Sequence, residues 1–207
     1  EKGGMYAPYT QGEKSQRYQD VLLRLREKRL VYPCSVSRRQ LRERGCKSVH
    51  GDILFPAELR DNCEEPMDIW GINWRFRVPD GETVSFFDVE LQKKISFTAG
   101  ADFGDFVAWR CEGMASSDLA AAVDDHDMHI TEAIRGGDLL LCTVRQILIH
   151  RALDWGIPNY GHCPLLLDEE GVKLSKRRGS ISLKSILHEG RDWRAMLRDY
   201  GFGSVLE

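Results

Sequence analysis

The chain has 207 residues, of which 29 are lysine or arginine and 32 are aspartate or glutamate, so its formal net charge is −3. With 42% hydrophobic and 29% charged residues, it is neither an intrinsically disordered chain nor a membrane protein. The near-neutral balance excludes a globally basic nucleic-acid coat but allows local basic patches. The six scattered cysteines are typical of reduced thiols, and we therefore expect a cytoplasmic protein.

An amphipathic helix is predicted first, from Glu13 to Leu30, because its apolar residues recur on one helical face. These residues are Tyr18, Val21, Leu22 and Leu25. A short strand at 30–32 is expected to stop at Pro33. Ser37 can then cap a basic helix that Gly45 closes. Residues 45–68 show no period and are interpreted as an excursion loop or small insert.

Strand signals follow this irregular segment. Trp74, Phe76 and Val78 alternate with arginines, and a turn at 79–81 leads to a second strand at 83–87. Further strands are expected at 105–110 and 130–134. These short alternating segments predict a sheet in the middle of the chain.

The last third predicts an α/β arrangement. Thr143 is expected to cap an amphipathic helix that ends at Gly156. The apolar run 164–167 suits a strand that is buried on both faces of a parallel sheet. Two short helices are expected near 182–188 and 192–200, and the alternation of strands and helices indicates the α/β class.

A basic loop carries the sharpest chemical signal. The segment Lys173-Leu-Ser-Lys-Arg-Arg-Gly179 contains four cationic side chains and follows the predicted buried strand and its turn. Lys173 and Lys176 can bind a polyphosphate together, with Ser175 as a hydroxyl donor. From charge alone, a solvated basic loop explains the same residues.

The sequence Lys-Leu-Ser-Lys-Arg resembles the second signature of the class I aminoacyl-tRNA synthetases, in the variant of the glutamyl branch. Upstream segments at 119–125, 134–140, 143–147 and 162–167 resemble segments found in the same order in that branch. Because no anticodon-binding domain follows the signature, the chain is most similar to the glutamyl-Q tRNA(Asp) synthetases. A fragment of a glutamyl-tRNA synthetase and a non-catalytic synthetase paralogue remain alternatives.

The resemblance implies a Rossmann-like class I catalytic domain with an inserted α+β subdomain. Residues 1–104 would form the connecting helix and the inserted subdomain, with a region resembling a zinc knuckle at 31–68. Residues 105–190 would form the second Rossmann half with the lysine loop, and 191–207 a C-terminal helix. The implied ligase activates glutamate with ATP and Mg²⁺ and transfers it to tRNA(Asp), modifying its queuosine base. We expect a monomer that does not contact a membrane.

The resemblance also implies roles for individual residues. Lys176 corresponds to the lysine that stabilises charge on the ATP phosphates, with Lys173 and Ser175 beside it. Arg135 corresponds to the residue that binds the carboxylate of the amino acid, and a structural salt bridge to a nearby aspartate is its alternative role. Ser117 stands where the family has a tyrosine that contacts the amino acid, so weakened glutamate recognition is expected. For the pair Asp124-Asp125, helix-end capping and loop hydrogen bonds are favoured over acid–base chemistry.

Two features of the family are missing from this sequence. No first class I signature precedes Met5, so we expect the N-terminal strand–helix portion to be absent and the chain alone to be inactive. The zinc knuckle retains only Cys34 of its Cys-x-Cys pair. Cys46, His50 and Cys63 could complete a closed zinc site, but a plain buried thiol at Cys34 is favoured, and no metal ligand is assigned.

Overall fold

The computed structural model describes residues 4–60, 64, 66–165, 167, 173, 188, 192 and 194–195. The chain divides into two compact units, Glu1–Cys163 and Pro164–Glu207. All bounded helices and strands of the described residues lie in the first unit. The helices predicted at 182–188 and 192–200 fall on a segment of which only isolated residues are described. No helix of the described residues combines the length and apolar character that a membrane span needs.

The elements of the first unit follow in chain order. The helices are α1 (Ser15–Glu27), α2 (Arg38–Arg44), α3 (Ser117–Asp127) and α4 (Leu140–Ala152), and the 3-10 turns are η1 (Gln11–Lys14), η2 (Ala57–Leu59) and η3 (Gly137–Leu139). The strands are β1 (Val31–Cys34), β2 (Asn73–Phe76), β3 (Thr83–Asp88), β4 (Lys93–Thr98), β5 (Phe106–Arg110), β6 (Met114–Ala115), β7 (Glu132–Gly136) and β8 (Asn159–Cys163).

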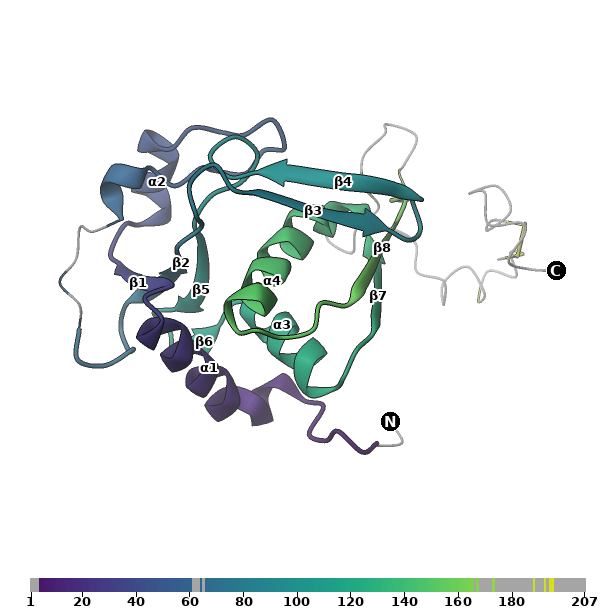
Figure 1. The fold of residues 1–207 in the computed structure, drawn as a ribbon, viewed down its shortest axis with the longest axis horizontal. Coiled ribbons are helices and arrows are strands. Elements are labelled where there is room, and N and C mark those ends of the chain that lie inside the picture. The colour runs from purple at the N-terminus through teal and green to yellow at the C-terminus, as the bar shows by residue number, and fades with distance from the viewer. Residues whose placement is uncertain are drawn as a thin grey trace. The chain divides into compact units, whose positions relative to one another are not determined.

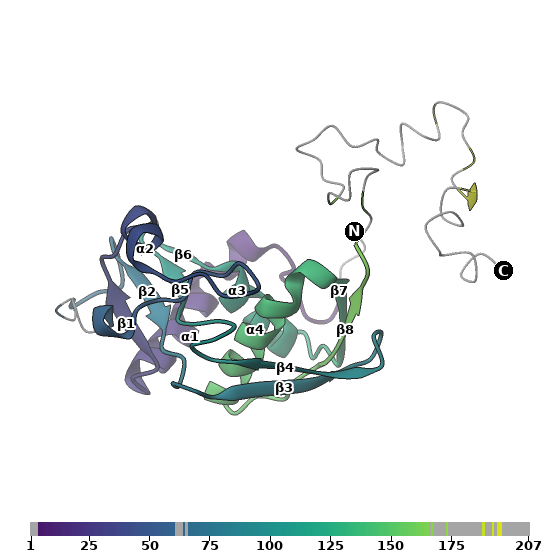
Figure 2. The same ribbon diagram turned by 90° about the horizontal axis from the view of Figure 1, so that it is seen from above.

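These strands form two four-stranded sheets, with α3 and α4 lying between them (Figures 1 and 2). The first sheet has the order β1-β2-β5-β6 and is antiparallel throughout. The second has the order β4-β3-β8-β7, in which β8 runs parallel to both β3 and β7. The unit β7-α4-β8 is therefore a parallel crossover, as the α/β prediction requires.

The predicted division at residue 104 does not coincide with a break between sheets. Strands β3 and β4 lie before this position, and β7 and β8 lie after it, yet all four pair in one sheet. Parallel pairing of β3 with β8 joins them across 72 residues of sequence, from Asp88 to Tyr160. The division into the two compact units falls between Cys163 and Pro164.

The predicted apolar stripe of α1 is buried as expected. Val21, Leu22 and Leu25 are fully buried, and they join a core that includes Trp74 and Trp109. Each such aliphatic side chain contributes roughly 1.5–3 kcal/mol through removal from water. The predicted helix over 13–30 is thus confirmed in its central part, with bounds at Ser15 and Glu27.

Local capping chemistry explains α2. The Ser37 hydroxyl accepts a hydrogen bond from the Gln40 backbone N–H at 3.2 Å, and Gln40 Oε1 accepts one from the Ser37 backbone N–H at 2.9 Å. This capping box satisfies two backbone donors that a helix start leaves open. Gly45 ends the helix, as predicted.

Three predicted boundaries differ from the structure. Pro33 lies within β1, which is tolerated because β1 is an edge strand. Thr143 does not cap α4: turn η3 leads the chain into the helix at Leu140, and the Thr143 hydroxyl lies within hydrogen-bond distance, 3.2 Å, of the Leu139 carbonyl. The buried parallel strand is β8, which ends at Cys163 just before the predicted run.

Candidate active site

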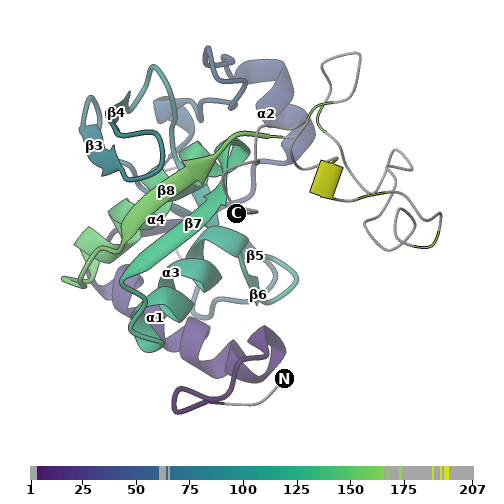
Figure 3. The same cartoon turned by 90° about the vertical axis from the view of Figure 1, so that its right-hand side faces the viewer.

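Arg135 lies near the carboxyl end of β7. Strand β7 runs directly beside β8 (Figure 3). In the parallel register Arg135 is paired with His162. Ligands of open α/β sheets bind at the carboxyl ends of such strands. Its side chain is mostly buried, with 13% exposed. Part of the guanidinium group is therefore accessible to a ligand.

The guanidinium of Arg135 is held from several sides. Its Nη1 donates to Gln146 Oε1 at 2.7 Å and, over a longer 3.4 Å, to Thr143 Oγ1. The face of the group lies over the ring of Tyr160, with Cζ 4.9 Å from the ring centroid. An arginine has five N–H donors. In the described part of the chain, no hydrogen bond engages the Nε–H of Arg135.

The salt bridge considered for Arg135 is present but long. Its Nη2 lies 3.6 Å from Asp125 Oδ2, beyond hydrogen-bond distance. Burial raises the pKa of Asp125, and the attraction of Arg135 opposes this shift. Asp125 therefore adds a nearby negative charge without occupying the donors of Arg135.

Of the two roles predicted for Asp124, the described residues show hydrogen bonds to another segment and no side-chain cap of a helix end. Its carboxylate accepts hydrogen bonds from Gln11 Nε2 and from the Tyr18 hydroxyl, each at 2.9 Å, and pairs with the ammonium of Lys14. These partners belong to η1 and α1. Asp124 therefore fastens the N-terminal segment to α3.

Asp88, His162 and Thr143 form a buried hydrogen-bonded chain that ends at Arg135. His162 Nδ1 lies 2.7 Å from Asp88 Oδ2, and His162 Nε2 lies 2.9 Å from Thr143 Oγ1. Burial disfavours ionisation of Asp88, but hydrogen bonds from Leu91 and His162 outweigh it and hold the pKa of this carboxyl below its ordinary value. No pattern in the sequence singled out Asp88, because its side-chain partner His162 lies 74 positions away and its other partners are backbone groups.

Ser117 is the first residue of α3 and is exposed. Its neighbour Ser116 caps the helix, accepting from the Leu119 backbone N–H at 3.2 Å. A cavity of about 670 Å³ opens beside this helix start and is bordered by Ser116 and Asp118. Within the described residues, no hydrogen bond joins Ser117 to Arg135.

The predicted lysine loop is described by the structure only at Lys173. Lys176 and Ser175 lie outside the described residues. Lys173 is exposed and forms an isolated antiparallel bridge with Leu167. The predicted roles of these residues therefore remain predictions.

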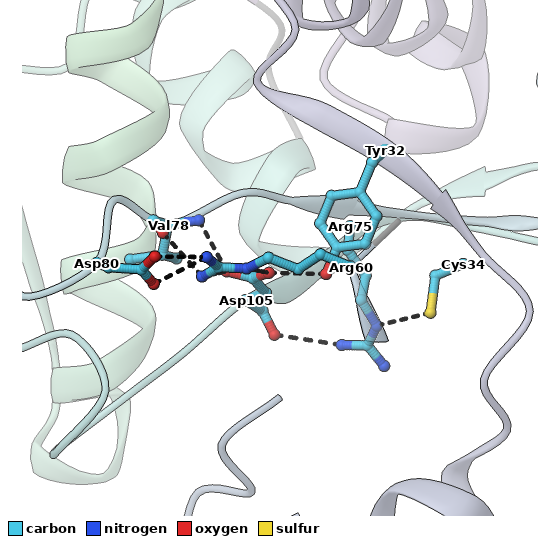
Figure 4. A network of polar contacts seen from close by, with 7 residues as sticks. All are labelled: Tyr32, Cys34, Arg60, Arg75, Val78, Asp80 and Asp105. Atoms are coloured by element: carbon cyan, nitrogen blue, oxygen red, sulfur yellow. Dashed lines mark hydrogen bonds and ion pairs between the residues drawn. The ribbon is translucent and has the colours of Figure 1, made fainter. Parts of the chain in front are cut away.

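The thiol of Cys34 contacts the side chain of an arginine (Figure 4). Its sulfur accepts a hydrogen bond from Arg75 Nε at 3.3 Å, and Arg75 Nη1 donates to the Asp105 carbonyl at 3.2 Å. Cys46 is exposed, and Cys63 is outside the described residues. The described part of the chain contains no group of three or more metal-ligating side chains.

Comparison with known proteins gives this geometry a context. Residues 2–200 match the family model of the catalytic domain of class I tRNA synthetases (E and Q). A glutamyl-Q tRNA(Asp) synthetase of Symbiobacterium thermophilum is 39% identical over 197 residues, covering 91% of this chain. A glutamate–tRNA ligase of Bacillus subtilis is 35% identical over 186 residues.

A solved structure agrees with these sequence matches. The glutamate tRNA ligase of Elizabethkingia meningosepticum, solved in complex with its amino acid, superposes with a TM-score of 0.68 at 27% identity and over 86% of this chain. The chain spans only part of these proteins: 60% of the Symbiobacterium relative and 38% of the Elizabethkingia chain.

Proposed function

Since this chain belongs to the family of class I tRNA synthetase catalytic domains for glutamate and glutamine, we propose that it forms part of an ATP-dependent glutamate-activating ligase. The proposed acceptor is tRNA(Asp), at its queuosine base, because relatives at 36–39% identity bear the name of that enzyme. Glutamate–tRNA ligases are similar at 35–36% identity, so tRNA(Glu) is the competing acceptor. The proposed working form is a cytoplasmic monomer.

The observation that carries this proposal is the arrangement around Arg135. Gln146 and Thr143 engage one end of its guanidinium, and Tyr160 covers one face. This leaves the edge made by Nε and Nη2 for a planar carboxylate, which a guanidinium can bind with two parallel hydrogen bonds. A carboxylate of the amino-acid substrate fits this edge.

The proposed chemistry is the formation of an acyl-adenylate. A carboxylate oxygen of glutamate attacks the α-phosphorus of ATP, a new O–P bond forms, and pyrophosphate leaves with the electrons of the broken bond. The protein contributes mainly position and charge neutralisation to such a step. Arg135 would orient the amino acid, while Lys173, Ser175 and Lys176 would contact the phosphates, with Lys176 stabilising charge in the transition state.

Mg²⁺ would accompany ATP as a charge-neutralising ion on the phosphates. The described residues contain no cluster of three or more ligating side chains suited to hold it. We therefore assign no residue of this chain to the ion, and no step of the proposal passes through it.

Glutamate-dependent exchange of labelled pyrophosphate into ATP tests the proposal, using the protein as its gene encodes it. Exchange should require L-glutamate, and Arg135→Ala should raise the KM for glutamate roughly 10- to 100-fold, since a lost charged hydrogen bond has about this effect. Arg151→Ala is the matched control, because Arg151 lies on α4 with a partly exposed side chain paired to Glu82. Absence of glutamate-dependent exchange would favour the non-catalytic paralogue.

Transfer of labelled glutamate distinguishes the acceptors. We expect label on tRNA(Asp) that contains queuosine and none on the same tRNA without this base. Label on tRNA(Glu) instead would identify a glutamate–tRNA ligase.

A further inference from the structure

We propose that Asp88, His162 and Thr143 act as a positioning triad that sets the orientation of the Arg135 guanidinium, and thereby the affinity for the amino acid. This inference rests on the proposed function, because it takes Arg135 as the group that binds the substrate's carboxylate. None of the three residues would touch the substrate. Their effect would pass through the contact between Thr143 and Arg135.

The triad begins with a carboxylate that cannot turn. Asp88 is the last residue of β3, and its Oδ1 accepts backbone N–H groups of Leu91, Glu90 and His162 at 2.9, 3.1 and 3.2 Å. Its Oδ2 faces His162 Nδ1 at 2.7 Å. Neither side chain has any exposed surface. Four hydrogen bonds thus fix the carboxylate, which in turn fixes the imidazole.

The imidazole passes this constraint on to α4. Because a carboxylate only accepts hydrogen bonds, Nδ1 of His162 carries a hydrogen. Nε2 then shares the second bond with the Thr143 hydroxyl, at 2.9 Å. The single hydrogen of the hydroxyl can go to Nε2 or to the Leu139 carbonyl, which lies 3.2 Å away. In either case a lone pair of the hydroxyl oxygen remains for Arg135 Nη1, which lies 3.4 Å away.

Stability of the core does not explain why these buried positions carry polar side chains. A buried ionic or polar pair is no more stabilising than well-packed apolar side chains of similar volume, because each polar group must lose its water. Here the chain of polar groups connects β3, β8 and α4 and ends on a partly accessible cation of β7. Misplacing a binding group by about 1 Å can cost roughly 100-fold in rate, so a rigid support for Arg135 has a functional consequence.

Two substitutions at Thr143 separate the hydroxyl from the shape of the side chain. Thr143→Val keeps the volume but removes the oxygen between His162 and Arg135, whereas Thr143→Ser keeps the oxygen. Asp88→Asn acts at the far end. An amide has only one oxygen, so it cannot accept both the backbone N–H groups and the Nδ1 hydrogen, as the two oxygens of Asp88 do. Asp105→Asn is the control: Asp105 is an equally buried carboxylate that accepts several hydrogen bonds, but it holds the other sheet.

The first readout compares two constants measured by pyrophosphate exchange with the full-length protein, the KM for glutamate and the KM for ATP. Thr143→Val and Asp88→Asn should raise the glutamate KM roughly 10-fold, an effect of about one lost hydrogen bond. The ATP KM should change less than two-fold, and Thr143→Ser should behave like the native protein. Equal effects on both KM values, or an equal effect of Asp105→Asn, would overturn the proposal.

The second readout does not depend on activity. The Nε–H resonance of Arg135, assigned by its loss in Arg135→Lys, should shift or broaden in Thr143→Val and in Asp88→Asn but not in Asp105→Asn. If this occurs in a protein that shows no glutamate-dependent exchange, the proposed function fails and the positioning role stands. If native exchange requires glutamate and Arg135, yet the resonance is unchanged in both variants, the positioning role is wrong and the function stands.

Discussion

Arg60 and Asp105 form a two-point ion pair in which the aspartate side chain is completely buried: Nε lies 2.7 Å from Oδ2, and Nη2 lies 2.9 Å from Oδ1. The Tyr32 hydroxyl and the Val78 backbone N–H complete the hydrogen bonds of the carboxylate, at 2.7 and 2.9 Å (Figure 4). This interaction fastens the irregular segment after α2 to the first sheet.

Removing this carboxylate should therefore destabilise the fold strongly. Asp105→Ala leaves Arg60 and Tyr32 without their main partner, and breaking a buried pair in this way costs about 3–5 kcal/mol. Asp80→Ala is the control, since Asp80 binds the same arginine at 2.8 Å but is 77% exposed. An exposed pair contributes below about 1 kcal/mol. Urea unfolding measures both, and similar losses in the two variants would contradict the assigned role.

His150 should make the protein sensitive to mild acid. It is fully buried on α4, and burial lowers its pKa from the ordinary 6.5 to about 4. Between these pH values the unfolded chain binds a proton that the folded chain does not. The neutral, buried His150 therefore carries no penalty above pH 6.5. As the pH falls toward 4, proton binding by the unfolded chain lowers the free energy of unfolding by about 2–3 kcal/mol.

The variant His150→Leu isolates this contribution. Its free energy of unfolding should fall by about 2–3 kcal/mol less than that of the native protein between pH 7 and pH 4. The pKa of His126 is also lowered by burial, but that residue is present in both proteins and cancels in the difference. Parallel pH profiles from urea unfolding would show that His150 is not the group responsible.

Local sequence patterns predicted the elements whose causes are local. The buried residues of α1 recur at the spacing of one helix face, and the capping box of Ser37 and Gln40 spans four positions. Thr143 was misassigned because a threonine at a helix start has the same sequence appearance whether it caps the helix or lies inside its first turn. The structure resolves the difference through turn η3, which continues directly into α4.

Long-range polar contacts were beyond sequence reasoning. Arg135 was identified through its resemblance to a family motif, yet Asp88 contributes to the same region from 74 residues before its partner His162. Nothing in the composition of β3 distinguishes this aspartate from a surface residue at a strand end. Asp124 illustrates the same limit, because its ties to Lys14 and Tyr18 exist only after α1 packs against α3.

The lysine loop is open to a kinetic test. Lys176→Ala should lower the rate of glutamate-dependent pyrophosphate exchange far more than it weakens ATP binding, because the proposed contact strengthens as charge develops on the phosphates. Lys94→Ala on β4 serves as an exposed control. An exchange rate unchanged by Lys176→Ala would remove this residue from the mechanism.

Ser117 offers the sharpest test of substrate recognition. It lies exposed at the first position of α3, so a tyrosine there does not have to enter the packed core. If the family's tyrosine contributes a hydrogen bond to the amino acid, Ser117→Tyr should strengthen glutamate binding roughly 10- to 100-fold, the equivalent of about 1.5–3 kcal/mol. Ser117→Phe adds the ring without the hydroxyl and should increase the affinity for glutamate much less.

Calorimetric titration of L-glutamate into the native protein and both variants measures the effect. Should the tyrosine variant bind no more tightly than the phenylalanine variant, the missing hydroxyl is not what limits recognition, and the amino-acid site must be completed by other residues.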